Sequence, residues 1–338
     1  MLVRLVRNQK NLTDWESRIR SQLSRGRVGK WGYLAHPRLD DFHWSRLLSL
    51  CKAEGQKVWY CMENSEPVLL FGLAHHSTHS DLFDFPVGRV APLVLLSSSL
   101  ENTLAALKHL PSKAKSMGFR LVSLRISTDD HLLNFVLSAH GWNHVGTSMK
   151  LAIERDSWLD RCRQSGNPTV YESYLSHISD SVHIRTAVKS DIPDLSRIIV
   201  AAHRHSHFFN DPLLPETART TLFPDWIAKS VNGSMDLVLV ACQEDRPIGF
   251  ASCLVSKGLK SFLDHEVGVL DFVAVDPDIQ GKGIGKRLLN ASYAWLFERC
   301  PVVELRTMAD NIPALRAYCR LGLIPAATDH HYHYWLRS

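Results

Sequence analysis

Runs of β-branched and apolar residues alternate with amphipathic stretches along most of the chain, and this alternation limits its fold more than any other feature. The runs predict strands at residues 58–62, 68–75, 89–96, 120–126, 183–187, 236–243, 247–256, 267–275 and 302–308, followed by terminal strand material. The amphipathic stretches predict helices at residues 100–117, 129–140, 192–203, 217–231, 283–299 and 311–321. Strands and helices that alternate at these lengths pack as a sheet covered by helices, so we expect an α/β fold.

The length of 338 residues predicts two domains rather than one. A polar stretch at residues 156–181 carries a turn signal at Gly166, Asn167 and Pro168, and we interpret it as a linker. The expected organisation is an N-terminal domain at residues 1–155 and a C-terminal domain at residues 182–338.

One segment of the chain is repeated. Residues 121–126 read like residues 302–307, and each segment precedes a short acidic loop, an amphipathic helix that ends at glycine (Gly141 or Gly322) and a further strand. Two copies of one supersecondary unit explain this match. The N-terminal copy has Leu137 opposite Tyr318, and serines at residues 97–99 where the C-terminal copy has glycines. The first copy is therefore expected to be degenerate, with function in the second half.

The composition narrows the class of protein. Hydrophobic residues make up 45% and charged residues 22% of the chain, as in ordinary globular proteins. The net charge of +5 comes from scattered lysines and arginines, which argues against a nucleic-acid partner and suits a small anionic ligand. Seven cysteines without a CxxC pair predict neither a disulfide framework nor a zinc ribbon. Neither a signal peptide nor a membrane span is indicated, so we expect a cytoplasmic protein, as monomer or homodimer.

A glycine-rich basic segment follows the apolar run at residues 267–275. The run stops at Asp276 and Pro277, and a helix begins soon after. The residues between are Gln280, Gly281, Lys282, Gly283, Ile284, Gly285, Lys286 and Arg287. Glycine lets the backbone approach a ligand closely, and the helix N-terminus and the lysines add positive charge. This arrangement predicts a pyrophosphate-binding site.

The spacing separates this segment from other phosphate-binding motifs. A P-loop needs Ser or Thr after its lysine, and Arg287 follows Lys286 here. A dinucleotide-binding fingerprint needs a third glycine, and Lys286 stands where it would lie. A glycine-rich turn without a ligand is the remaining alternative, and it leaves the interleaved lysines unexplained.

A second motif follows the run at residues 302–308. Asn311 can cap the next helix, and Ala314 and Tyr318 share one face of it because they are four residues apart. Together the two segments resemble the GNAT superfamily of N-acetyltransferases over residues 183–335. The family motif Q/R-x-x-G-x-G/A is met by Gln280, Gly283 and Gly285, and N-x-x-A-x-x-x-Y by Asn311, Ala314 and Tyr318.

The resemblance implies acetyl-CoA as cosubstrate, without a metal. Its pantetheine would lie along the backbone of Val273, Ala274 and Val275, and its pyrophosphate on the amides from Gln280 to Lys286, with Asn311 as a further cofactor contact. The fold implied is two GNAT-like mixed-sheet domains in tandem.

The same resemblance makes Tyr318 the general acid that protonates the departing thiolate. A packed core tyrosine is the alternative. Asp271 is the first candidate for the base, because an unpaired carboxylate buried in an apolar run costs free energy and so calls for an explanation. A structural hydrogen bond is an equal alternative for Asp271, and His265 and Glu266 are other candidate bases.

Two histidine groups, at residues 203–207 and 330–333, invite a metal interpretation. Neither has the spacing or the accompanying carboxylates and thiolates of a metal site, so we expect solvated or substrate-contacting loops. Alternation along a strand would put His331 and His333 on one side. Residues 203–211 are a candidate specificity loop, because this segment shapes the acceptor pocket in the superfamily.

The tandem organisation also resembles the TDP-fucosamine acetyltransferase branch of the superfamily. Residues 81–90 look like that branch's FFGFxVGR segment, with Asp84 in place of its glycine. A nucleotide-linked amino sugar is the acceptor this implies, with Arg204, Lys257 and Lys260 as candidate phosphate contacts. The expected function is direct acetyl transfer to a primary amine of a small molecule. A protein N-terminus, lysine, polyamine or aminoglycoside is an alternative acceptor, and a non-catalytic acyl-CoA sensor is an alternative class.

Overall fold

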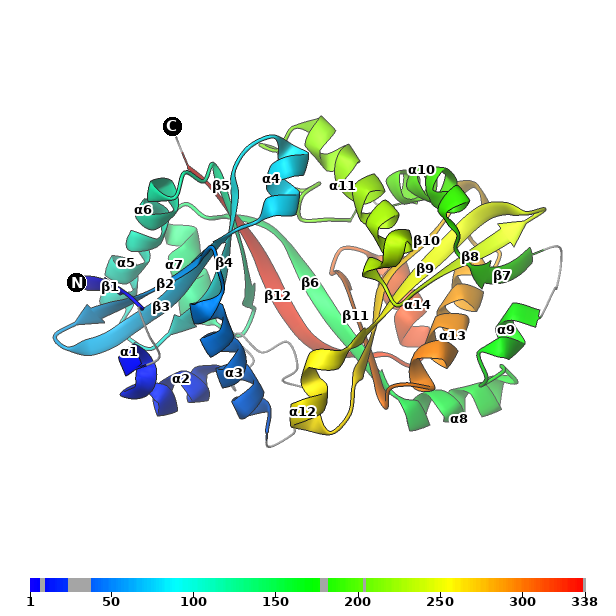
Figure 1. Ribbon diagram of the computed structural model, residues 1–338, viewed down its shortest axis with the longest axis horizontal. Coiled ribbons are helices and arrows are strands. Elements are labelled where there is room, and N and C mark those ends of the chain that lie inside the picture. Colours follow the sequence, from blue (N-terminus) through cyan, green and yellow to red (C-terminus); the bar gives the residue numbers. More distant parts are fainter. Residues whose placement is uncertain (7–9, 24–37, 177–181, 203–204, 337–338) are drawn as a thin grey trace. The chain divides into compact units, whose positions relative to one another are not determined.

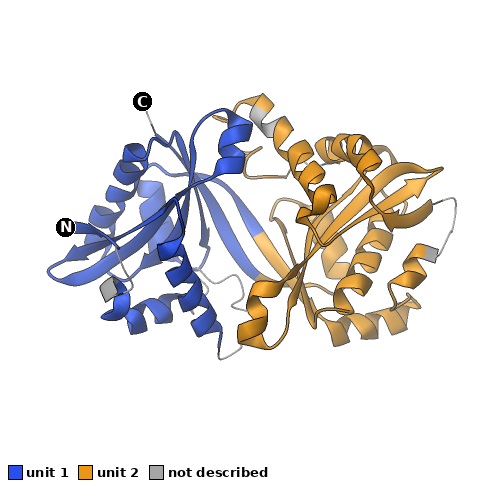
Figure 2. Cartoon of the chain, in the orientation of Figure 1, with its two compact units in different colours: residues 1–148, 327–338 blue, residues 149–326 orange. Residues whose placement is uncertain are grey.

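The computed structural model describes residues 1–6, 10–23, 38–176, 182–202 and 205–336, the side chains of residues 10, 11, 176 and 218–220 apart. These residues form an α/β protein with two compact units (Figures 1 and 2). The first unit comprises residues 1–148 and 327–338, and the second comprises residues 149–326. The α/β fold predicted from the sequence is confirmed.

The first unit contains the following elements, in chain order: β1 (Leu2–Leu5), α1 (Lys10–Thr13), α2 (Glu16–Gln22), α3 (Leu39–Lys52), β2 (Gln56–Glu63), β3 (Glu66–His75), α4 (Ser77–Phe83), β4 (Val87–Leu95), α5 (Leu100–Leu107), α6 (His109–Ser116), β5 (Leu121–Ser127), α7 (His131–Ala139) and the start of β6 (Asn143–Glu154). Its strands lie in the order β1-β2-β3-β4-β5-β12, where β12 (Ile324–Trp335) is the last strand of the chain. Strand β4 is parallel to β5, and the other pairs in this order whose register is known are antiparallel.

The second unit contains α8 (Arg155–Ser165), α9 (Glu172–Ser176), β7 (Val182–Thr186), α10 (Ile192–Ala202), α11 (Glu216–Lys229), β8 (Leu237–Gln243), β9 (Arg246–Ser256), α12 (Lys260–Leu263), β10 (Val267–Val275), α13 (Ile284–Phe297), β11 (Val302–Met308) and α14 (Ile312–Arg320). Short turns of other helix types lie at η3 (Lys189–Asp191), η4 (Ser230–Ser234), η5 (Lys257–Leu259) and η6 (Pro277–Ile279). Its strands lie in the order β6-β11-β10-β9-β8-β7.

The repeat seen in the sequence corresponds to a repeated supersecondary unit. The elements β11, α14 and β12 each start and end 181 residues after β5, α7 and β6. Asp130 caps α7 by accepting from the Leu133 amide, as Asn311 caps α14 by accepting from the Ala314 amide. The two halves therefore share a strand–helix–strand unit of the same length.

The last strand of each repeat explains why the compact units differ from the expected domains. Residues 329–335 of β12 pair with β5 in the first unit, from Asp329↔Ser127 to Trp335↔Leu121. The end of β6, by contrast, lies beside β11 in the second unit. The first unit thus takes its final strand from the C-terminal end of the chain, which a boundary at residue 182 does not allow for.

The expected linker is largely helical. Residues 156–176 contain most of α8 and all of α9, and residues 177–181 lie outside the described part of the chain. Trp158, Cys162, Tyr171 and Tyr174 belong to the core of the second unit. Burial of these aromatic rings makes the segment part of a domain rather than a connection.

Helices cover both faces of each sheet. In the first unit one core lies beneath α5, α6 and α7, and a second core lies between the opposite face and α2 and α3. In the second unit α8, α9, α13 and α14 share one core with the sheet. The other face contacts α11, where Phe223 and Trp226 pack on Phe272 of β10.

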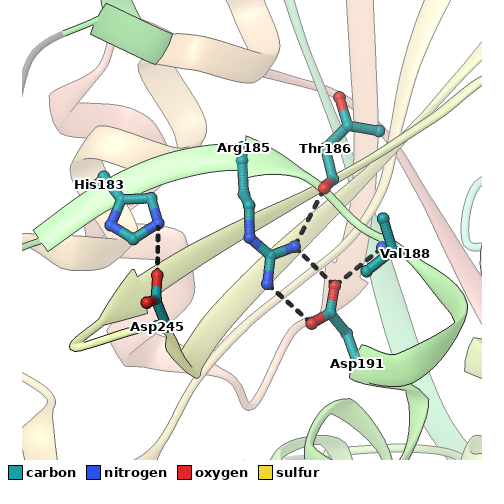
Figure 3. A network of polar contacts seen from close by, with 6 residues as sticks. All are labelled: His183, Arg185, Thr186, Val188, Asp191 and Asp245. Atoms are coloured by element: carbon teal, nitrogen blue, oxygen red, sulfur yellow. Dashed lines mark hydrogen bonds and ion pairs between the residues drawn. The ribbon is translucent and has the colours of Figure 1, made fainter.

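A half-buried ion pair connects β7 to the turn η3 that precedes α10 (Figure 3). Arg185 Nη1 donates to Asp191 Oδ2 at 2.7 Å and Nη2 donates to Oδ1 at 2.8 Å. The Val188 amide donates to the same carboxylate at 2.8 Å. Three charge-assisted hydrogen bonds therefore fix the turn by which the chain leaves the sheet edge.

Candidate active site

Strands β10 and β11 run parallel and then separate, which opens one edge of β10. Their register runs from Val267↔Val302 to Leu270↔Leu305 and ends there. On its other side β10 stays paired with β9 as far as Val275↔Gly249, with a bulge between Leu270 and Phe272. A bulge bends the strand and changes the direction in which its side chains point. The backbone of Val273, Ala274 and Val275 thus lies beyond the last β10–β11 pair.

The glycine-rich segment connects this open edge to α13. After the turn η6, Gln280 has extended backbone angles and its side-chain amide donates to the Val275 carbonyl at 3.0 Å. Gly281 and Gly283 have φ of +83° and +80°, and an added Cβ would meet no atom within 4 Å at either position. Glycine suits these two positions because other residues rarely adopt such angles, and the space beside each backbone is open.

The start of α13 has the properties of an anion site. Gly283 is its N-cap, without a side-chain cap hydrogen bond, and the helix is 14 residues long. Lys282 and Lys286 are exposed beside it. The uncapped amides, the helix dipole and the two lysines favour negative charge. Arg287, by contrast, donates to the Val182 carbonyl at 3.1 Å. The residues present therefore fit a pyrophosphate-bearing cosubstrate.

Tyr318 lies on α14 with its side chain in the core shared with α13. It is 7% exposed, and burial raises the pKa of its phenol to about 12. Tyr293 of α13 lies close enough for the Tyr318 phenol to raise the pKa of the Tyr293 phenol further, after burial. Tyr318 therefore faces the helix whose N-terminus forms the anion site.

Asn311 stabilises the helix that carries this tyrosine. Its side-chain oxygen accepts from the Ala314 amide at 3.3 Å, and its side-chain nitrogen donates to Thr307 Oγ1 at 3.3 Å. The predicted cap is confirmed. Both polar atoms of the side chain contribute to local structure, and a cofactor contact by Asn311 stays a prediction.

The expected environment of Asp271 was wrong. Its side chain is exposed, because the bulge between Leu270 and Phe272 turns it out of the apolar alternation that the sequence suggested. The other two candidate bases lie at the start of β10: Glu266 is 3.9 Å from Lys260 Nζ, and Nε2 of His265 is buried without a hydrogen-bond partner in the described part of the chain.

Sequence reasoning missed a buried ion pair on the same sheet. Lys150 Nζ of β6 lies 3.4 Å from Glu304 Oε2 of β11, with the two side chains 2% and 3% exposed. Glu304 is paired with Val269, one position before β10 and β11 separate. The sequence did contain one sign of this pair: Glu304 interrupts an apolar strand, at the position that Ser123 occupies in the first repeat.

The candidate specificity loop adjoins the turn before α14. His205 Nδ1 lies 3.5 Å from Asp310 Oδ1, and within the loop Phe208 is 5% and Asp211 0% exposed. His203 and Arg204 lie outside the described residues. Lys257 and Lys260, the candidate phosphate contacts, lie 4.0 Å from Asp236 and 3.9 Å from Glu266.

The C-terminal histidines are mostly buried rather than solvated. His331 and His333 lie on one face of β12, as alternation predicts, and are 7% and 0% exposed. His331 Nε2 is 2.8 Å from Ser148 Oγ. Among the described residues no group of three or more His, Cys, Asp or Glu side chains could hold a metal ion. Within the same residues no helix is long and apolar enough to span a membrane.

A parallel strand pair that separates beside a glycine-rich helix start, with a buried tyrosine on the following helix, defines an acyl-CoA-dependent acyltransferase site. The chain belongs to the acetyltransferase (GNAT) family, whose pattern matches residues 200–323. The family in general uses acetyl-CoA.

Relatives support this assignment. A mycothiol acetyltransferase of Nocardioides sp. is 41% identical over 244 residues, which are 68% of this chain and 79% of that protein. The spore coat polysaccharide biosynthesis protein SpsD of Bacillus subtilis is 29% identical over 131 residues, 38% of this chain. The match spans less than half of SpsD, 43% of its length.

A solved structure shares the tandem fold. A tandem GNAT protein from the clavulanic acid biosynthesis pathway, solved without acetyl-CoA, aligns with a TM-score of 0.57 at 12% identity, over 100% of this chain and 99% of that chain. The prediction of two GNAT-like domains in tandem is confirmed.

Proposed function

We propose that the second unit transfers an acetyl group from acetyl-CoA to a primary amine of a small molecule, by direct attack in a ternary complex. One observation carries the proposal: the open edge of β10 leads through two left-handed glycines to the uncapped start of α13, and Tyr318 packs against that same helix.

The cosubstrate would follow these elements in order. An extended amide-containing chain such as pantetheine can add to a free strand edge, here the backbone of Val273, Ala274 and Val275. The pyrophosphate would then reach the amides from Gln280 to Lys286, with Lys282 and Lys286 supplying charge. When bound, acetyl-CoA supplies an activated thioester carbonyl.

The transfer needs one group that donates a proton and one that accepts a proton. The amine nitrogen attacks the thioester carbonyl, the C–S bond breaks, and its electron pair goes to sulfur. Tyr318 would give its phenolic proton to that sulfur. Burial raises the pKa of the phenol to about 12, so Tyr318 stays protonated across the physiological range. The transfer leaves a phenolate on Tyr318, which takes up a proton from solvent before the next cycle.

The proton of the amine must leave as the new bond forms. Asp271 is our first candidate for its acceptor because the bulge exposes its carboxylate beside the point where β10 and β11 separate. His265 and Glu266 are the alternatives. A bound water can relay the proton to any of the three.

The acceptor we favour is an amine on a sugar or sugar-containing molecule, such as a nucleotide-linked amino sugar. The names of two relatives, one of polysaccharide biosynthesis and one of mycothiol acetylation, support a carbohydrate-related acceptor. The loop from His205 to Asp211 adjoins the turn before α14, where it can select the acceptor.

The test is a thiol-release assay with acetyl-CoA and pooled amines, including nucleotide amino sugars, polyamines and aminoglycosides. Tyr318→Phe should lower kcat by about 10²-fold or more, as expected for a lost general acid, and leave the Kd for acetyl-CoA within threefold. Tyr293→Phe is the matched control, because its buried hydroxyl has no hydrogen-bond partner among the described residues.

The two variants distinguish the rival readings. Equal activity of Tyr318→Phe and Tyr293→Phe would remove Tyr318 from the mechanism. Tight acetyl-CoA binding without thiol release for any amine would identify a non-catalytic acyl-CoA sensor instead.

A further inference from the structure

The sheet of the first unit has one apolar and one polar face at β5 and β12. Leu124 and Ile126 of β5 and Tyr332 of β12 belong to the core beneath α5, α6 and α7. Because side chains alternate along a strand, Ser123 of β5 and His333 of β12, which pair with each other, point to the opposite face.

Three polar residues form a row across that face. Arg89 of β4 pairs with Ser123 of β5, which pairs with His333 of β12. Residues directly opposite one another on neighbouring strands share a face, so the row runs from an exposed arginine to a histidine that is 0% exposed. On its other side Arg89 pairs with Ala74 of β3.

A second arginine approaches this row from α3, the helix that packs on the same face. Arg46 is exposed at the surface, yet the protein around its guanidinium lowers the pKa of that group by desolvation, and the charge of Arg89 lowers it further. Among the described residues neither Arg46 nor Arg89 has an ion-pair or hydrogen-bond partner. Two guanidinium groups that repel each other, neither of them paired with a carboxylate of the described residues, leave a concentrated positive charge.

Two histidines lie near Arg89: His76, which caps α4, and His79, in the first turn of that helix. The rings of His76 and His79 are parallel, with centroids 3.6 Å apart. The pKa of His79 is lowered to about 3 by burial and then by His76, His333 and Arg89. The pKa of His76 is lowered by burial and then by Arg89. Arginines and histidines, rather than acids, are therefore the charged groups that act on these rings.

We propose that this face of the first unit binds a phosphate-bearing ligand, held by Arg46 and Arg89 with His76, His79 and His333 as further hydrogen-bond donors. A guanidinium forms paired hydrogen bonds to the oxygens of a phosphate, and two of them balance a doubly charged group. The ligand would relieve the repulsion between the two arginines. This site belongs to the degenerate unit and does not depend on acetyl transfer.

The experiment is a calorimetric titration of inorganic pyrophosphate into the full chain, with coenzyme A at saturating concentration to fill the anion site at α13. Arg46→Gln/Arg89→Gln should weaken pyrophosphate binding at least about tenfold. The control Arg4→Gln/Lys52→Gln removes the same charge from exposed positions of the same unit and should leave the Kd within twofold. Thermal melts verify that both variants fold.

Three results would overturn the proposal. One is a wild-type chain that takes up no pyrophosphate under these conditions, and another is equal binding by the two double variants. The third is binding of citrate but not of phosphate or pyrophosphate, which would assign the face to carboxylates. Failure of coenzyme A to bind would contradict the proposed function and not this proposal. In that case, weaker pyrophosphate binding by Arg46→Gln/Arg89→Gln than by the wild-type chain would still support the site on the first unit.

Discussion

Lys150 Nζ and Glu304 Oε2 lie 3.4 Å apart inside the second unit, with side chains that are 2% and 3% exposed. Removing one member of a buried pair leaves a charge without compensation, which typically costs about 3–5 kcal/mol. We expect Glu304→Ala to lower the free energy of unfolding by that amount in urea denaturation. The double variant Lys150→Met/Glu304→Leu should recover most of it, because apolar side chains of similar volume often replace a buried pair without loss.

An exposed pair of the same unit is the control for this prediction. Lys260 and Glu266 lie 3.9 Å apart, and the lysine side chain is 68% exposed. Lys260→Ala should change stability by less than about 1 kcal/mol, since solvent screens such pairs. If Glu304→Ala and Lys260→Ala lowered the free energy of unfolding equally, burial would not explain the contribution of the Lys150–Glu304 pair.

The carboxylate of Asp191 should stabilise the second unit in a pH-dependent way (Figure 3). Its hydrogen bonds with Arg185 lower its pKa from the ordinary value. A lowered pKa means that the contribution is complete above the unfolded value of about 3.9 and is lost as the pH falls through the folded value. Asp191→Asn should cost about 1–3 kcal/mol at pH 7, and the difference from wild type should shrink below about pH 4.

Urea denaturation between pH 7 and pH 3 measures this effect. Asp245→Asn is the matched control, because Asp245 is 96% exposed and lies 3.8 Å from His183 in the same network. A difference between wild type and Asp191→Asn that stays constant down to pH 3 would contradict the assignment.

Gly283→Ala tests the left-handed backbone at the start of α13. An added Cβ meets no atom, so the cost comes from φ of +80°, about 1–2 kcal/mol for an L-residue. We also expect at least about tenfold weaker acetyl-CoA binding, since the Cβ occupies space that the proposed ligand needs. Gly258→Ala has equally open space without the positive φ and should leave both quantities unchanged. Unaltered acetyl-CoA affinity in Gly283→Ala would argue against the proposed site.

His79 should make the first unit less stable in acid. Its pKa is about 3 in the folded chain, against an ordinary value of 6.5. Between these values the unfolded chain binds one more proton, so stability falls as the pH falls, by up to about 1.4 kcal/mol per pH unit. His79→Phe keeps a ring beside Phe83 and should flatten this dependence, measured by denaturation from pH 7 to pH 4. His131→Gln removes an exposed histidine and should keep the wild-type slope.

Much of the fold could be read from local patterns. The predicted strands at residues 267–275 and 302–308 match β10 and β11 at both ends, because long β-branched runs between turn residues have few alternatives. The helix predicted at residues 100–117 is instead two helices, α5 and α6. Pro111, which lacks an amide donor, lies in the first turn of α6, where a continuous helix would need that donor. The prediction of a linker at residues 156–181 was wrong, because Trp158 and Tyr174 are buried in the core of the second unit and the polar composition of the segment does not indicate this burial.

The sequence by itself determined the glycine-rich helix start, the capped helix with Tyr318 and the duplication, since each depends on residues a few positions apart. Only the tertiary structure decided which strand completes each sheet, that Asp271 is exposed, and that Lys150 meets Glu304. It also decided that Arg46, Arg89 and His333, from three distant segments, share one face. Strand pairing and burial depend on contacts between residues far apart in the chain, and no local pattern records them.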